Sequence, residues 1–163
     1  MAPSKSSLAK KARANVAAIL THALAEELLL SSTTREFYAK VPAFHSLHKL
    51  FADQYRQLGQ WLDQLAKRTW SLGAVHGQME KLASARSLEL PERVSERTML
   101  GELLALHEEL AKHLQDDVAK CAGQLGDPNS ADILRHLVEF HENTAWMLRT
   151  VRDGSAPTPA HGP

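Results

Sequence analysis

Apolar positions in this chain recur every three or four residues over long stretches, and the alternation typical of strands is missing. The clearest stretch covers residues 44–73 and ends near a glycine, which is a common helix stop. Its predicted inward stripe consists of Phe44, Leu47, Phe51, Tyr55, Leu58, Leu62, Leu65, Thr69 and Leu72. The pattern predicts a helix of nearly thirty residues.

Three more helices follow from the same spacing. A first helix over residues 8–40 is closed by Pro42, and a third begins near Ser95 and stops at the Gly126-Asp127-Pro128 breaker. A fourth covers residues 131–152, with Asn129 or Ser130 as its cap. Its predicted inward positions are Ile133, Leu134, Leu137, Phe140, Trp146, Leu148 and Val151.

The connection between the second and third helices breaks the simple up-and-down plan. Residues 74–94 are too many for a tight turn, and residues 78–88 have the pattern of a short helix that Pro91 ends. The sequence therefore predicts an all-α, ferritin-like four-helix bundle with a short helix in a long crossover between helices 2 and 3.

Composition limits the partners and the compartment. The 163 residues carry 19 basic and 19 acidic side chains, so the chain as a whole is not a basic nucleic-acid binder. Cys121 is the only cysteine, which excludes an internal disulfide and fits a reducing compartment. We expect one bundle domain over residues 8–152, flexible tails over residues 1–7 and 153–163, no membrane span and a cytoplasmic location.

Two segments resemble the Dps (DNA protection during starvation) miniferritins. Residues 36–73, EFYAKVPAFHSLHKLFADQYRQLGQWLDQLAKRTWSLG, follow without gaps the register of that family's ligand-bearing region, and residues 130–148, SADILRHLVEFHENTAWML, resemble its last helix. The resemblance implies four-helix subunits in a hollow dodecameric shell. It also implies ferrous iron oxidised with peroxide at intersubunit sites and ferric mineral stored inside.

The expected metal site spans two subunits. His48 and Asp63 lie fifteen residues apart on one helix, roughly 22 Å along its axis, so one chain cannot bring both to one ion. The resemblance implies that His48 of one subunit faces Asp63 of its neighbour, and that Glu36 takes the place of the family's first histidine. Ala52 and Lys67 replace two carboxylates of the family pattern, so three of five ligand positions differ and the enzymatic activity is left open.

Three interpretations of these substitutions remain. Glu36 and Lys67 form an intersubunit salt bridge that weakens or closes the iron site, because an ammonium repels a dication. Alternatively, Glu36, His48 and Asp63 form a rearranged iron site, with or without His45. In the third interpretation these residues are ordinary solvated side chains.

Acidic residues on the later helices suggest routes for iron. The resemblance places Asp132 and Glu142 at threefold pores, where negative rings concentrate cations, although Asp132 also suits a helix start. An acidic face on the third helix is a candidate mineral-nucleating patch or a solvated surface. It includes His107, Glu108, Glu109, His113, Asp116 and Asp117.

The N-terminal segment carries a basic cluster without an acid: Lys5, Lys10, Lys11 and Arg13. Such a cluster resembles the lysine-bearing tails of DNA-binding Dps proteins, and many copies on one shell would bind DNA multivalently. Ordinary solvated side chains at a helix start are the alternative.

The leading functional hypothesis is a Dps-like iron-storage and detoxification cage that protects DNA from oxidative damage, with a weakened or lost oxidation site. A second hypothesis keeps the shell without the enzyme, for DNA compaction or for mixed assembly with an active paralogue. A third is a plain helical bundle that acts as an interaction protein, which predicts a monomer or dimer.

Overall fold

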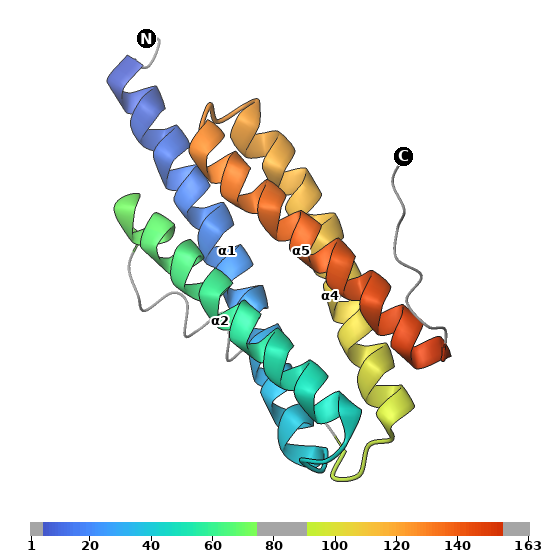
Figure 1. The fold of residues 1–163 in the computed structure, drawn as a ribbon. Coiled ribbons are helices and arrows are strands. Elements are labelled where there is room, and N and C mark those ends of the chain that lie inside the picture. Colours follow the sequence, from blue (N-terminus) through green and yellow to red (C-terminus); the bar gives the residue numbers. More distant parts are fainter. Residues whose placement is uncertain (1–4, 75–90, 155–163) are drawn as a thin grey trace.

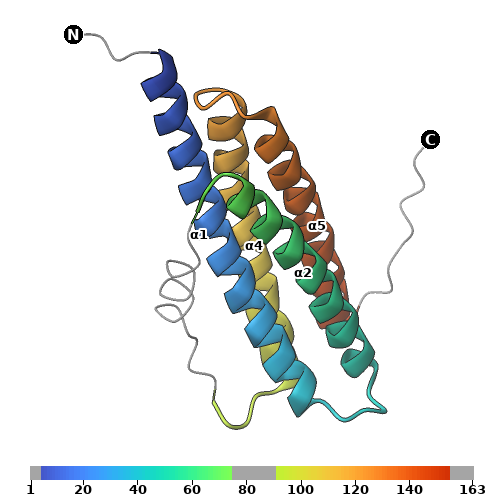
Figure 2. The same cartoon turned by 90° about the vertical axis from the view of Figure 1, so that its left-hand side faces the viewer.

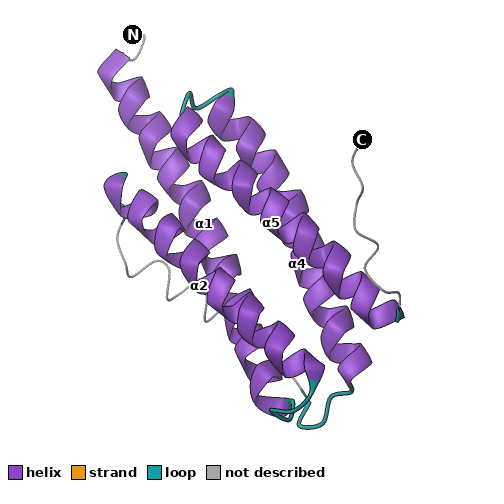
Figure 3. Ribbon diagram, in the orientation of Figure 1, coloured by secondary structure: helices purple, strands orange, loops and turns teal. Residues whose placement is uncertain are grey.

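Four long helices make up the described parts of the chain, with no strand among those residues (Figure 3). The computed structural model describes residues 5–74 and 91–154, and for residues 5–8 the backbone alone. The helices are α1 (Lys5–Lys40), α2 (Ser46–Ser71), α4 (Glu96–Ala122) and α5 (Pro128–Asp153). This confirms the predicted all-α four-helix class, whereas the short helix expected at residues 78–88 lies outside the described residues.

The helices form two antiparallel hairpins. Residues 41–45 join α1 to α2, and residues 123–127 join α4 to α5. Helix α2 ends beside the first half of α1, whereas α4 starts at the opposite end of the bundle (Figures 1 and 2). The end of α2 and the start of α4 therefore lie at opposite ends of the bundle, as in the ferritin-like arrangement. As a result α1 runs antiparallel to α4, and α2 antiparallel to α5.

The core is built mainly from leucine. Its largest fully buried apolar side chains are Leu20, Leu30, Phe37, Phe51, Leu58, Leu65, Leu103, Leu114, Leu134, Leu137 and Leu148. Cys121 is buried at the same level, and its burial, followed by the charges of Asp117 and Asp127, raises the pKa of its thiol to about 11. Because the thiolate is the reactive form, a thiol with this raised pKa has low reactivity.

Several predicted inward positions are wrong. Phe44 is 93% exposed and Tyr55 40%, and on α5 Trp146 is 49% and Val151 39% exposed. Phe44 lies in the turn before α2, which begins at Ser46, so it is not on the helix stripe at all. A helical period identifies an apolar face, but it cannot tell which edge of that face a neighbouring helix covers.

The ends of the helices also differ from prediction. Helix α1 begins at Lys5, three residues before the predicted start at residue 8. The N-cap of α5 is Asp127, not Asn129 or Ser130: its carboxylate accepts from the Ser130 backbone N–H at 3.0 Å, and Pro128 occupies the first turn. Proline suits that position because its missing N–H would have no partner there. Residues 155–163 lie outside the described parts.

Helix α1 contains a long apolar stretch, which the sequence prediction of no membrane span did not take into account. By length and composition its Ala9–Lys40 part is sufficient to cross a membrane, but 61% of its most apolar window is buried inside the bundle. A central core helix has the same property, because neighbours cover it on several sides.

Candidate metal centre

Glu36 and Lys67 each have an ion-pair partner on their own helix. Near the end of α1, Lys40 Nζ lies 3.0 Å from Glu36 Oε1. On α2, Lys67 Nζ lies 2.6 Å from Asp63 Oδ2, one helical turn away. The predicted carboxylate ligand Asp63 is therefore already paired with the lysine that replaces a carboxylate of the family pattern.

His48 lies in the first turn of α2 against the end of α1. Its ring packs on Tyr38, with centroids 4.2 Å apart and planes tilted by 37°. Ala52, one turn further along α2, adds no donor atom. His48 is thus partly exposed at this end of the bundle, as is His45.

His45 serves a different purpose from metal binding. Its Nδ1 accepts from the Leu47 backbone N–H at 3.2 Å and so caps α2, while its Nε2 lies 3.0 Å from Glu96 Oε1. Both ring nitrogens are engaged, which fixes the neutral tautomer with the proton on Nε2. This geometry argues against His45 as a ligand in a rearranged site.

A single chain does not assemble the predicted centre. Across residues 5–74 and 91–154, no three His, Cys, Asp or Glu side chains are already grouped to hold a metal ion. The long separation of His48 and Asp63 along α2 gives the reason. Completion by a neighbouring subunit stays a prediction.

The candidate pore residues lie on α5 and are exposed. Asp132 Oδ1 accepts from Arg135 at 3.0 Å, and its other oxygen is 3.8 Å from His136. Glu142 accepts from the Gln115 side chain of α4 at 2.7 Å. Asp132 is partly neutralised within its own chain, and its role at a pore stays a prediction.

The basic cluster lies along the first turns of α1. Lys10 and Lys11 are exposed, and Arg13 donates through Nη2 to the Ser71 backbone carbonyl at 2.8 Å. That contact ties the start of α1 to the last turn of α2, whose carbonyls carry partial negative charge. Arg13 therefore has a structural role beside any contact with phosphate.

Three polar side chains that sequence reasoning missed meet in the middle of the bundle. Glu27 of α1, His107 of α4 and His141 of α5 are all 0% exposed. His141 Nε2 lies 2.5 Å from Glu27 Oε1, and its Nδ1 lies 2.8 Å from His107 Nδ1. They form a linear hydrogen-bonded chain, which we call the buried Glu–His–His chain. His107 was expected on a solvated acidic face of the third helix, and that prediction is wrong.

The two ends of this chain have no hydrogen-bond partner among the described residues: Glu27 Oε2 and His107 Nε2. Burial, and after it the neighbouring His141, holds the pKa of His107 well below its ordinary value of 6.5. His107 is therefore neutral, and in either of its tautomers one proton lies between the two Nδ1 atoms. A buried polar chain with open ends costs stability relative to an apolar core.

The spacing of the chain does not suit a shared metal ion. Two nitrogens bonded to one tetrahedral ion at about 2.05 Å lie about 3.3 Å apart. The two Nδ1 atoms lie only 2.8 Å apart, and the second nitrogen of His141 is engaged by Glu27.

The sequence did contain one signal of this buried chain. Glu27 is an acidic residue at an apolar position in the period of α1.

The comparisons with known proteins agree with this architecture. The ferritin-like domain model matches residues 17–154, and the chain belongs to the ferritin-like family. Its fold is that of the Dps proteins, which confirms the resemblance drawn from the two sequence segments.

Individual relatives cover nearly the whole chain. An uncharacterized low temperature-induced protein of Nostoc sp. is 32% identical over 157 residues, covering 93% of this chain and 88% of its own length. DpsC from Streptomyces coelicolor has a TM-score of 0.78 at 23% identity, covering 93% of this chain and 90% of that one. Dps from Staphylococcus aureus has a TM-score of 0.74 at 25% identity, covering 84% and 94%.

Proposed function

We propose that the protein assembles into a Dps-type homo-oligomeric shell, expected to be a dodecamer, that stores iron in the cytoplasm and has a weakened oxidation site. Support for the cage comes from the ferritin-like family and the Dps fold over most of the chain. Iron is the substrate and cargo of such a cage. A Vibrio cholerae Dps of the same fold is described as a member of the ferritin-like diiron-carboxylate superfamily.

The Asp63–Lys67 pair is the main observation in favour of a weakened oxidation site. The 2.6 Å contact neutralises the carboxylate that the neighbour's His48 would share, and Ala52 supplies no replacement. At an effective dielectric near 20, two unit charges about 4 Å apart interact by about 4 kcal/mol, so a dication at that distance from the ammonium is repelled by roughly 8 kcal/mol. The donor set therefore fits iron poorly.

This mechanism differs from an intersubunit Glu36–Lys67 bridge. Lys67 already has a carboxylate on its own helix, and Glu36 has Lys40. The loss of affinity for iron thus requires no salt bridge between subunits. On assembly, Glu36 and Lys67 can still exchange their partners within the chain for partners on a neighbouring subunit. A rearranged site retains Glu36, His48 and Asp63, without His45 for the reason given above.

Iron oxidation tests the weakened site. Purified protein receives ferrous iron and peroxide, and absorbance of the ferric product is followed against a protein-free control. We expect a rate close to that control, and a clear gain for Lys67→Glu. Lys49→Glu is the matched control, because Lys49 is also an exposed lysine of α2 paired with an aspartate one turn away.

The outcomes separate the site from the shell. Oxidation by the unmodified protein well above the control contradicts the weakened site but leaves the cage intact. Light scattering tests the cage independently: a particle many times the 18.0 kDa chain is expected, and a monomer or dimer contradicts it.

Ala52, which supplies no donor atom whatever stands at position 67, favours a second candidate function, a shell without oxidation activity. Such a shell compacts DNA or forms mixed assemblies with an active paralogue. It is distinguished by a large particle that shows no gain in oxidation with Lys67→Glu.

A further inference from the structure

Contacts between histidine and glutamate join the two halves of the bundle. We call the boundary between the α1–α2 hairpin and the α4–α5 hairpin the hairpin seam. Three contacts between a ring nitrogen and a carboxylate oxygen cross it: His141–Glu27 at 2.5 Å, His113–Glu26 at 3.3 Å and His45–Glu96 at 3.0 Å. Arg68 of α2 and Asp127 form a further contact at 2.9 Å. Arginine keeps its charge at every ordinary pH, whereas imidazole changes its charge near neutral pH, so the histidines make the docking of the hairpins sensitive to pH.

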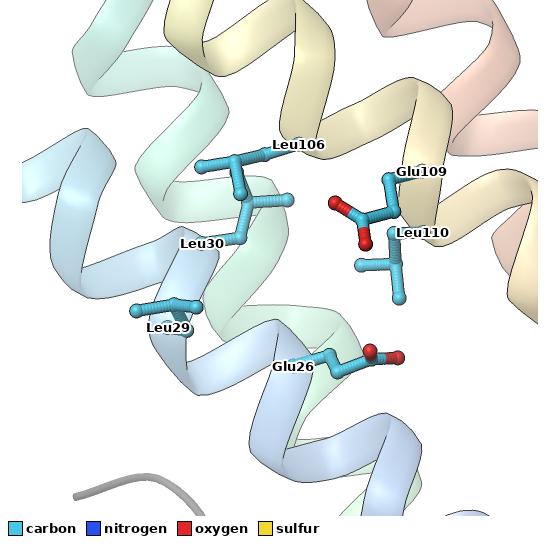
Figure 4. A pocket seen from close by; sticks show the side chains of 6 residues that line it. All are labelled: Glu26, Leu29, Leu30, Leu106, Glu109 and Leu110. Atoms are coloured by element: carbon cyan, nitrogen blue, oxygen red, sulfur yellow. The ribbon is translucent and has the colours of Figure 1, made fainter. Parts of the chain in front are cut away.

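The hairpin seam is incompletely filled beside these contacts. A pocket of about 60 Å³ lies between α1 and α4, and Figure 4 shows the carboxylates of Glu26 and Glu109 next to four leucines. These leucines are Leu29, Leu30, Leu106 and Leu110. Side chains that line a void have no partner atoms on that side, so they lose little contact when the two helices part.

The buried Glu–His–His chain has a fixed direction when Glu27 is ionised. The carboxylate can only accept, so His141 donates to it through Nε2, and the Nδ1 of His141 becomes an acceptor. His107 then donates through its own Nδ1, which lies 2.8 Å away. The chain therefore ends in the lone pair of His107 Nε2, a buried atom without a hydrogen-bond partner in the described parts of the protein.

A second proton on His107 is unfavourable in the closed bundle. It creates a buried N–H at Nε2 with no acceptor and places a positive charge in an apolar core. The titratable groups that face the ring are His141 of α5 and, beyond it, Glu27 of α1. From α2 the uncharged Trp61 packs on this side, against Phe140, whose ring lies edge-on to His107. Burial and the neighbouring His141 accordingly hold the pKa of His107 well below its ordinary value.

The exposed contacts of the hairpin seam respond differently and weakly. An imidazolium at His113 attracts Glu26 more strongly than the neutral ring does, but the His113 side chain is 44% exposed and water screens the gain. A proton on His45 Nδ1 breaks its hydrogen bond from the Leu47 N–H. Neither change outweighs the penalty of charging the buried His107 ring.

We propose that the buried Glu–His–His chain is a pH-sensitive latch of the hairpin seam. In mildly acidic solution, separation of the two hairpins exposes His107 to water and allows its ring to take up a proton. Each hairpin stays formed, because contacts such as Arg13 with the Ser71 carbonyl and Gln115 with Glu142 hold it together independently of His107. The latch acts within one chain and does not depend on the proposed shell or its iron site.

Labelling of Cys121 tests the latch. The chain's only cysteine is 0% exposed and belongs to the core that both hairpins share, so a thiol reagent reaches it through open molecules. Purified full-length protein is labelled with 4,4′-dithiodipyridine between pH 5 and pH 7.5. Each rate is divided by that of His107→Gln at the same pH, which cancels the chemistry of the thiol. We expect this ratio to rise about tenfold from pH 7.5 to pH 5.5, because only the open form takes up the proton.

The dependence of the labelling rate on urea separates hairpin opening from unfolding of the whole chain. Hairpin separation exposes less surface than global unfolding, so its urea slope should be clearly smaller than the slope that circular dichroism gives for unfolding. Equal slopes overturn the proposal, as does a labelling ratio that stays constant between pH 7.5 and pH 5.5.

Two further variants keep the test decisive. His136→Gln, at an exposed histidine of α5, should show the same pH dependence as the unmodified protein. Should His107→Gln not fold, His107→Leu takes its place, because an apolar side chain at a buried polar site is often neutral or stabilising. The rise of the ratio toward acid should be the same with either reference, and its absence overturns the proposal.

Discussion

Asp127 links two helices through one carboxylate. It caps α5 by accepting from the Ser130 N–H at 3.0 Å, and it accepts from Arg68 Nη2 of α2 at 2.9 Å through each of its oxygens. Partial burial acts to raise the pKa of Asp127, but the hydrogen bonds from Ser130 and then Arg68 outweigh it and hold that pKa below its usual value. The side chain therefore stabilises both the helix start and the α2–α5 contact.

Asp127→Ala should lower the free energy of unfolding by about 1–2 kcal/mol, the usual effect of losing an N-cap. Urea denaturation followed by circular dichroism measures the change. Asp53→Ala is the control, since Asp53 forms only surface pairs with Lys49 and Arg56 within α2. Equal effects of the two substitutions would mean that the cap and the Arg68 contact add nothing beyond a surface charge.

The buried Glu–His–His chain makes stability depend on pH. The folded protein holds the pKa of His107 well below 6.5, so below pH 6.5 the unfolded chain binds a proton at this residue that the folded one does not. Stability should therefore fall as the pH drops below about 6.5, by up to about 1.4 kcal/mol per pH unit from this one group. Denaturation midpoints between pH 5 and pH 8 measure this slope.

His107→Gln removes the titrating ring and should flatten the slope below pH 6.5, while the Glu27–His141 contact is retained. His136→Gln, at an exposed histidine on α5, should leave it unchanged. If the slope is the same with and without the His107 ring, protonation of His107 does not destabilise the fold.

At single residues, the sequence predicted departures from a family pattern but not side-chain contacts between distant helices. Ala52 and Lys67 were recognisable as departures because a family pattern supplied the reference. The partners of Glu27 were not, because His141 lies 114 residues further along and no local period joins them. Local spacing predicts which face a side chain occupies, whereas long-range pairing depends on how the hairpins dock.

At the scale of elements, the helices themselves followed from periodicity and breakers. Pro42 and the Gly126-Asp127-Pro128 segment separate helices because proline removes a donor and glycine reaches positive φ, as Gly126 does at 61°. The long crossover between the second and third helices was predicted from the number of residues between them alone. The exposed aromatic positions were not predicted, since Phe44 and Trp146 have the apolar character of core residues but are 93% and 49% exposed within the described part of the chain.

The α1–α2 turn carries the most exposed of these side chains. Phe44 is 93% exposed, so its whole side chain is available for contact with another surface. If subunits form the proposed shell with this turn at a contact, Phe44→Ser should move the particle toward smaller species on dilution. Size-exclusion mass measures the shift, and circular dichroism checks that helix content is kept. Identical masses at every concentration would place Phe44 outside the contact.

At the scale of the whole molecule, zero net charge and a local basic cluster have opposite consequences. A single chain offers few contacts to phosphate: Lys10 and Lys11 are exposed, while Arg13 is partly engaged by Ser71. Many copies on one shell bind through their summed contacts, so affinity depends on assembly and falls steeply with salt.

The DNA hypothesis therefore makes a prediction that joins charge and assembly. In a gel shift the assembled protein should retain duplex DNA at low salt and release it at moderate salt, because neutralised phosphates recover their counterions. Lys10→Gln combined with Lys11→Gln should abolish retention, whereas Lys112→Gln combined with Lys120→Gln, which removes the same charge from α4, should not. Absence of retention by the intact shell at low salt would leave storage without DNA contact, because a basic cluster that fails to hold DNA even at low ionic strength has no electrostatic affinity for phosphate.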